Sequence, residues 1–381
     1  MELDFTWLLW GLPLAFALGW GASRLDIRQW RAVNRQTPKA YFRGLNHLLN
    51  EQQDQAIDAF IEAVQGDPDT AELHFALGNL FRRRGDYDRA VRVHEHLLAR
   101  ADINRKDRDR AQHALALDFL KAGLLDRAEA ALHKLEGTSF QGEALLALLA
   151  IYERSRDWPQ AKGVARRLEA AEQGSFTTRL AHYLCEEAEQ LQRAGDATQA
   201  LQRLVEAVQQ APQLARGWIA LSALKAQTGD ALGAFAALES LGQQAPQGLP
   251  LAAAALANLA RQTGQQAQAS ALLQACHERA PSLDVTEALA SLDADPSAIR
   301  ARYLNHLERE PSLVIATRWL AGETLSDAAA QPLVMTALEQ ASTPLKRYRC
   351  AACGFEASQH FWQCPGCQSW DSYPARRVEE L

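Results

Sequence analysis

Four cysteines near the C-terminus are the residues of this chain best suited to chemistry. Cys350 and Cys353 form one C-x-x-C pair, Cys364 and Cys367 form a second, and ten residues separate the pairs. A C-x-x-C turn directs two thiolates at one point, and a second turn opposite it completes the tetrahedral sulfur cage that zinc prefers. A glycine after the first pair and a proline inside the second favour the tight turns whose N–H groups surround such thiolates. The spacing therefore predicts a metal site.

Three states of these sulfurs are compatible with the spacing. Zinc is the expected metal, iron is the less common alternative for four thiolates, and two stacked disulfides are the third possibility. The module, residues 344–381, is too short to bury an apolar core of its own, so we expect the metal to supply most of its folding free energy. No open coordination position is evident, and His360 is interpreted as a surface residue. The expected metal is therefore structural.

The N-terminus carries an uncharged apolar segment. Residues 5–22 are long enough to cross a bilayer, which needs about 17–25 residues. A cleaved signal peptide is the alternative, since Ala15-Phe16-Ala17 has a cleavage pattern, but the basic residues follow the apolar segment instead of preceding it. We therefore expect a transmembrane anchor over 1–23 and a basic juxtamembrane helix over 24–36. Positive charge stays in the cytoplasm, so the short N-terminus should be periplasmic and the rest cytoplasmic.

Small residues recur at every fourth position of this anchor. Gly11, Ala15 and Gly19 would form one face of a helix, where another transmembrane helix could approach closely. The alternative is that these residues reflect ordinary transmembrane composition. The stripe is a candidate partner face.

Residues 37–280 repeat with a period of about 34 residues, which is typical of tetratricopeptide repeats. Leu77-Gly78 in a first helix, a Gly85-Asp86 turn and Ala90 in a second helix define the pattern. The small residue of the second helix recurs at Ala56, Ala90, Ala128, Ala161, Ala200, Ala234 and Ala269, and the turn residue at Gly85, Gly123, Arg156, Gly195, Gly229 and Gly264. We expect an all-α solenoid of about seven repeats, followed by degenerate or capping helices over 281–343.

A solenoid presents the first helix of each repeat on its inner face. Tyr41, Phe75, Asn79, Arg82 and Arg83 are predicted to lie there, where apolar side chains beside arginines could bind a peptide. The alternative for each of them is a solvated helix face.

The sequence contains none of the motifs that would indicate catalysis. Phosphate-binding glycine loops, nucleophile elbows and zinc-protease helices are missing, and His94-Glu95-His96 places its histidines on different helix faces. A net charge of −6 and 7% aromatic residues disfavour nucleic-acid binding. We expect a protein that is not an enzyme.

The order of an anchor, a tetratricopeptide array and a four-cysteine tail resembles the lipopolysaccharide assembly protein B family of Gram-negative bacteria. The most similar segments are 77–82, 123–129 and 350–367. The resemblance implies an inner-membrane adaptor with a rubredoxin-like metal module. Its partners would be the committed deacetylase of lipid A synthesis, the membrane AAA+ zinc protease that degrades it, and an inner-membrane regulator that senses lipopolysaccharide.

Two other functions remain open from the sequence. The chain could be a scaffold that holds lipopolysaccharide synthesis and transport enzymes together without delivering any of them for degradation. It could also be a redox protein using rubredoxin-like iron. The turnover of the deacetylase distinguishes the first from an adaptor, and the colour of the purified protein distinguishes the second.

Overall fold

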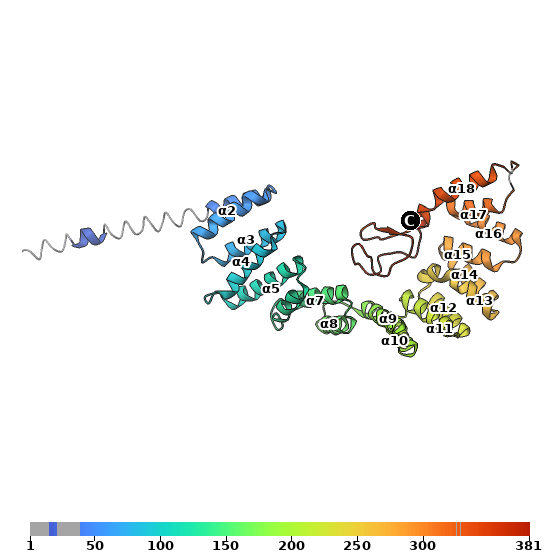
Figure 1. The fold of residues 1–381 in the computed structure, drawn as a ribbon, viewed down its shortest axis with the longest axis horizontal. Helices are drawn as coiled ribbons and strands as arrows, with labels where there is room; N and C mark the ends of the chain where they lie inside the picture. The colour runs from blue at the N-terminus through green and yellow to red at the C-terminus, as the bar shows by residue number, and fades with distance from the viewer. Residues whose placement is uncertain (1–14, 21–38, 325, 328) are drawn as a thin grey trace, which may run out of the picture. The chain divides into compact units, whose positions relative to one another are not determined.

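A computed structural model describes residues 15–20, 39–324, 326–327 and 329–381 (Figure 1). The chain divides into two compact units, Met1–Asp157 and Trp158–Leu381. Each is described by itself.

The first unit is built of antiparallel helix pairs. A helix over 39–49 precedes the others, and pairing joins each helix to the next along the chain. The labelled helices are α2 (Gln53–Gly66), α3 (Ala71–Arg84), α4 (Tyr87–Ala99), α5 (Arg105–Lys121), α6 (Leu125–His133) and α7 (Gln141–Ser155). Phe60, Leu77 and Phe81 are among the buried side chains that fill the space between the first pairs.

The second unit continues with helix pairs and adds the C-terminal module. Its helices are α8 (Trp158–Ala170), α9 (Thr177–Arg193), α10 (Ala197–Gln210), α11 (Ala215–Gln227), α12 (Ala231–Gln244), α13 (Ala253–Thr263), α14 (Gln266–Arg279), α15 (Leu283–Leu292), α16 (Pro296–Arg309), α17 (Leu313–Ala321) and α18 (Gln331–Ser342). Short 3₁₀ helices are η1 (Pro246–Ala252), η2 (Pro344–Lys346) and η3 (Val378–Glu380), and the strands are β1 (Tyr348–Arg349) and β2 (Glu356–Ala357).

The predicted repeat positions have the geometry that the tetratricopeptide pattern requires. All seven alanines, from Ala56 to Ala269, are fully buried, because neighbouring helices cross closely at these positions. The six predicted turn residues all have positive φ, from +58° at Arg156 to +90° at Gly85. Arg156 adopts a conformation that glycine accepts at lower cost. The all-α solenoid class is confirmed.

Three further positions in the first repeats, Glu51, Gly44 and Gly78, have the backbone or packing that the repeat requires. Glu51, 34 residues before Gly85, also has positive φ (+58°) and is the turn residue of the first repeat, which the sequence did not reveal because it is not glycine. A Cβ at Gly78 would lie 2.5 Å from Nε2 of His94, and one at Gly44 would lie 2.7 Å from the Phe60 ring. The two helices of these repeats therefore pack across glycine.

The helices after residue 281 continue the solenoid although its sequence signals fade. Among the described residues of the expected capping segment 281–343 there are four α-helices, α15 to α18, and the last two are separated because α17 ends at Ala321 and α18 begins at Gln331. Arg302 of α16 forms an ion pair with Asp293, and Arg318 of α17 forms one with Glu287 of α15. Ion pairs thus join these helices, in which the apolar repeat pattern of the sequence is weaker.

The expected anchor falls mostly outside the described residues. Gly11 and the basic segment 24–36 lie outside them, while Ala15 and Gly19 belong to a short exposed helix at 15–20. No helix within the described ranges combines the length and apolarity needed to span a membrane. The anchor and its orientation stay predictions.

Candidate metal centre

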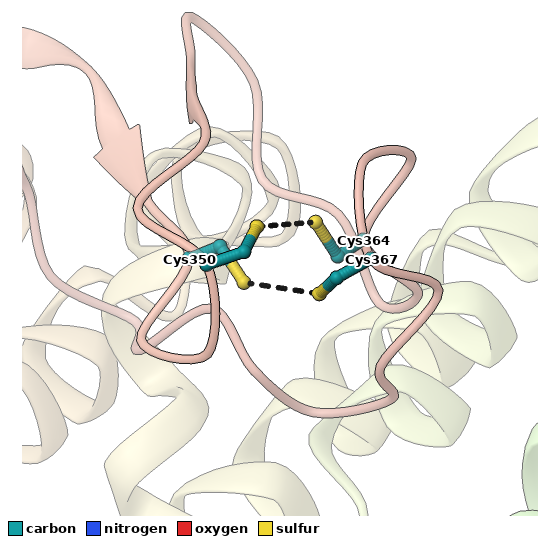
Figure 2. A group of neighbouring side chains, drawn as sticks. Cys350, Cys364 and Cys367 are labelled. Atoms are coloured by element: carbon teal, nitrogen blue, oxygen red, sulfur yellow. Dashed lines mark hydrogen bonds between the residues drawn. The ribbon is translucent and has the colours of Figure 1, made fainter. Parts of the chain in front are cut away.

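The four predicted cysteines converge on one point in the second unit. Their sulfur atoms all lie within 4.8 Å of one another. Cys350 Sγ is 3.8 Å from Cys367 Sγ, and Cys353 Sγ is 3.7 Å from Cys364 Sγ (Figure 2). A tetrahedron with metal–sulfur bonds of about 2.3 Å has edges of about 3.8 Å, so the four sulfurs fit a tetrahedral metal. These sulfur–sulfur separations are far longer than the about 2.05 Å of a disulfide, so the two-disulfide alternative does not describe this geometry.

Two equivalent turns hold the sulfurs. In the first, Gly354 donates its N–H to the Cys350 carbonyl at 2.9 Å, and in the second Gln368 donates to the Cys364 carbonyl at 2.8 Å. Gly354 has φ +77° and Gln368 has φ +61°, each four residues after its first cysteine. The sequence predicted the first turn from its glycine. The second places the left-handed residue at a glutamine, and neither Pro365 nor Gly366 takes that conformation.

The cage lowers the pKa of two of its thiols, Cys350 and Cys367. The pKa of the Cys350 thiol falls to about 6: burial by itself would raise it, but hydrogen bonding by Ser372 and by the N–H groups of Cys353 and Ala352 outweighs burial. The Ser372 hydroxyl lies 3.2 Å from Cys350 Sγ. Ser369 likewise lowers the pKa of Cys367. For Cys353 the N–H of Phe355 favours the thiolate, but burial and the neighbouring cysteines outweigh it and raise the pKa to about 12. Thiolates are the form that binds a metal.

The module is seated on the solenoid. Its own core is small and consists of Tyr348, Tyr373 and the two buried cysteines, with Phe361 and the solenoid residue Leu251 packed against it. His360 is half-buried, with Nε2 3.0 Å from the Tyr373 carbonyl and its ring against Trp362. It is therefore an internal residue of the module, in contrast to the surface position expected from the sequence. The solenoid supplies apolar contact that the short module lacks.

The residues that follow the last cysteine attach the module to α9. Both carboxylate oxygens of Asp371 lie 2.9 Å from Nε2 of His182, a fully buried side chain. The Trp370 ring packs against His182, Tyr183 and Trp158 with centroids 4.6, 6.1 and 6.5 Å away. On its other side, His182 lies 3.4 Å from the buried Arg216.

The C-terminal residues attach the module to α15 and α17. Arg377 forms a paired contact with Asp284 at 2.7 and 2.9 Å and lies over the Tyr348 ring. Glu380 accepts the N–H of Leu283 at the start of α15, and Glu379 accepts the N–H of Leu313 at the start of α17. Carboxylates stabilise helix N-termini because the first N–H groups lack partners within the helix. The last residues thus tie two solenoid helices to the metal module.

Two segments of the chain match known protein families. Residues 348–373 match a rubredoxin metal binding domain, and residues 73–110 match a tetratricopeptide repeat. Lipopolysaccharide assembly protein B of Escherichia coli strain K12 is 32% identical over 397 aligned residues that cover all of both chains. The chain belongs to the lipopolysaccharide assembly protein B family. A relative of the same name from Haemophilus influenzae is 27% identical, covering 95% of this chain and 96% of its own.

Among solved structures, a tetratricopeptide repeat protein from Parabacteroides merdae is similar to this chain at 14% identity, with a TM-score of 0.35. The similarity covers 68% of this chain and 99% of that protein.

The predicted partner residues of this family member have different environments. Phe75 lies in the core beneath the Arg110 guanidinium and is only 1% exposed. It therefore does not lie on the open face, where the sequence had placed it. Arg82 bonds Asn79 and the buried Asp118, which also lies against His94. Tyr41 is half-buried against Phe60. Only Arg83 is exposed.

Sequence reasoning missed the residues that seat the module. Trp370, Asp371 and Arg377 follow the last cysteine, and nothing in their spacing indicates partners such as His182, 189 residues before Asp371, or Asp284, 93 residues before Arg377. The signal available was composition, since 361–377 holds two tryptophans and several charged residues in a segment too short for its own core.

Proposed function

We propose that this chain is a membrane-anchored, non-catalytic adaptor that controls lipopolysaccharide biosynthesis by presenting the committed lipid A deacetylase to a membrane AAA+ zinc protease. The observation that carries the proposal is the 32% identity to lipopolysaccharide assembly protein B across the full length of both chains. Similarity over anchor, repeats and metal module together favours a shared function over a shared fold alone. An inner-membrane regulator that senses lipopolysaccharide is the third proposed partner.

The adaptor role draws support from an available surface in the first unit. Leu146 lies 15 residues before Ala161, as Phe75 lies 15 residues before Ala90, but the Leu146 side chain is 46% exposed. Arg83, on α3, is exposed as well. Exposed apolar and cationic groups on first helices suit an adaptor, because peptides bind solenoids there. Leu146 replaces Phe75 as the proposed apolar contact.

We infer that the metal is zinc and that it is structural. The four sulfurs fill a tetrahedral set and leave no position for a substrate, which is the arrangement of a structural zinc site. Iron would fit the same sulfurs. Purified protein that is colourless and holds one zinc per chain supports the inference, and red protein with iron contradicts it.

The anchor is proposed for residues 5–22, with the small-residue face Gly11, Ala15 and Gly19 toward a partner helix. An adaptor for a membrane protease gains from confinement to the membrane, since tethering raises the effective concentration of its client. The topology proposed is a single pass through the bacterial inner membrane, with a short periplasmic N-terminus and the remaining chain in the cytoplasm.

The half-life of the deacetylase tests the adaptor. In cells lacking this chain, the deacetylase should persist several times longer than in cells that contain it. Leu146→Asp should also lengthen the half-life, while Leu232→Asp, at a leucine on α12 that is more exposed (62% against 46%), should not. A deacetylase half-life that is the same with and without the chain would instead support the non-proteolytic scaffold.

A further inference from the structure

A cleft in the second unit separates the inner side of the metal module from the solenoid. Its volume is about 810 Å³, and residues from α9 to η1 form one wall while 360–376 forms the other. The floor is apolar, with buried Leu214, Gly248 and Tyr373 and the partly exposed Leu251. The cleft therefore offers a binding surface that the metal centre itself does not use.

The rim of this cleft carries an amide pattern that the sequence repeats. The segment Gln-Gln-Ala-Pro-Gln occurs at 209–213 and again at 243–247, one 34-residue repeat later. Gln210, Gln213, Gln244 and Gln247 line the cleft, two from each copy. Their side-chain amides make no hydrogen bond to any residue that the structure describes. Each carboxamide remains able to donate and to accept one.

The glutamines of the two copies occupy corresponding places in neighbouring repeats. Gln210 ends α10 and Gln244 ends α12, and both helices pack against α11. An extended peptide that runs along this wall would meet amides from both copies, because each of its residues presents main-chain N–H and C=O groups.

The module supplies the charge that completes the site. Arg376 lines the cleft and forms neither an ion pair nor a hydrogen bond within the described part of the chain, whereas the adjacent Arg377 is paired to Asp284. Trp362, half-buried in the same wall, adds an aromatic surface. A guanidinium beside an apolar floor binds a carboxylate more strongly than one in open water, because its hydrogen bonds are charge-assisted.

We propose that this cleft binds an extended peptide whose main chain pairs with the duplicated glutamines and whose carboxylate pairs with Arg376. The carboxylate is that of an acidic side chain of the bound peptide. The site is separate from the first-helix surface around Leu146, and peptide binding here does not depend on whether the chain delivers a deacetylase.

Peptide selection with the full-length, metal-loaded protein tests the site. Random octapeptides displayed internally and octapeptides displayed with a free C-terminus form the two arms. We expect both arms to enrich peptides with an acidic residue at a fixed position and to keep binding when the C-terminus is amidated. Enrichment only of peptides that need a free C-terminus would contradict the proposal.

Variants then locate the binding. Arg376→Gln should weaken the selected peptides about tenfold and Gln244→Ala about fivefold, while Gln243→Ala, the exposed neighbour outside the cleft, should leave affinity unchanged. Unchanged thermal unfolding of all three variants shows that they fold. The proposal is overturned if no peptide is enriched above background, or if the selected peptides bind Arg376→Gln and Gln244→Ala as tightly as the natural chain.

Discussion

Asp371 places both carboxylate oxygens 2.9 Å from Nε2 of His182, joining residues 189 positions apart. His182 is fully buried, and its other ring nitrogen lies near Arg216. A histidine between a carboxylate and a guanidinium can donate to the former while it faces the latter. This contact fixes the metal module on α9.

Replacing Asp371 by Asn should loosen the module without removing its metal. Asp371 is 44% exposed, so water would take over part of the lost interaction and the cost should be about 1 kcal/mol. The expected change is a drop of about 2–4 °C in the unfolding temperature of the second unit, with metal content unchanged. Glu356→Gln is the control, because it breaks a surface pair with Arg349 and should shift the temperature much less. Loss of the metal in Asp371→Asn would contradict this assignment.

Replacing Cys353 by Ser should remove the metal and unfold the module. A closed tetrathiolate site supplies roughly 10–16 kcal/mol, and one missing thiolate forfeits much of it. Mass spectrometry of the native protein measures the metal, and hydrogen exchange should show new opening at the starts of α15 and α17, where Glu379 and Glu380 would be lost.

The first unit should keep its protection in the same experiment. Cys276→Ala is the matched control, since this buried thiol lies in α14 outside the cluster and should leave metal content intact. A Cys353→Ser protein with a full equivalent of metal would show that the site is not built from these four sulfurs.

Replacing Gln368 by Gly should stabilise the metal module. Gln368 has φ +61° and its N–H is already satisfied by Cys364, so glycine keeps the turn and relieves backbone strain of about 1 kcal/mol. The reverse change, Gly354→Ala at φ +77°, should destabilise the module by a similar amount. Rates of metal release to a chelator rank the two variants against the natural chain. Slower release from Gly354→Ala than from Gln368→Gly would contradict the turn geometry.

The second unit should lose stability as the pH falls below about 6.5. Burial lowers the pKa values of His182 and His306, and burial together with the neighbouring His306 lowers that of His277 to about 4. The unfolded chain therefore takes up protons at a higher pH than the folded chain, so stability is present above pH 6.5 and declines below it.

At pH 5 the loss should be about 1–2 kcal/mol for His277, allowing for its partial screening. Chemical unfolding at pH 7.5 and pH 5 measures it, and His277→Gln should reduce the difference between the two. An unfolding free energy that rises on acidification would contradict the sign.

Removing residues 1–22 should release the protein from the membrane fraction. The truncated chain should keep its affinity for partners but fail to complement in cells, because tethering supplies effective concentration and not contact. Replacing Gly11, Ala15 and Gly19 together by Leu should preserve insertion and weaken partner recovery. Full complementation by the truncated chain, or wild-type recovery of protease and regulator by the triple variant, would count against these two roles.

Local patterns in the sequence were sufficient for the solenoid and for the metal ligands. Each buried alanine and each turn glycine is required by contacts within one repeat, and each C-x-x-C pair is required by a single turn. The spacing of these residues in the sequence is therefore enough to predict the structure around them. The turns at Glu51, Arg156 and Gln368 show the limit of this reasoning. At these three turns, contacts with the surrounding structure hold a residue other than glycine at positive φ, a conformation that it rarely adopts without them.

Only the tertiary structure decided where the module sits and which predicted surface residues are available. The pairing of Asp371 with His182, the capping of α15 and α17 by the last glutamates, and the burial of Phe75 beneath Arg110 join segments far apart in the chain. Such contacts leave no periodic signal, because a short polar segment can satisfy its groups against many surfaces. The position of the module is decided by the hydrogen-bond donors and apolar surfaces that the folded solenoid leaves without a partner of its own.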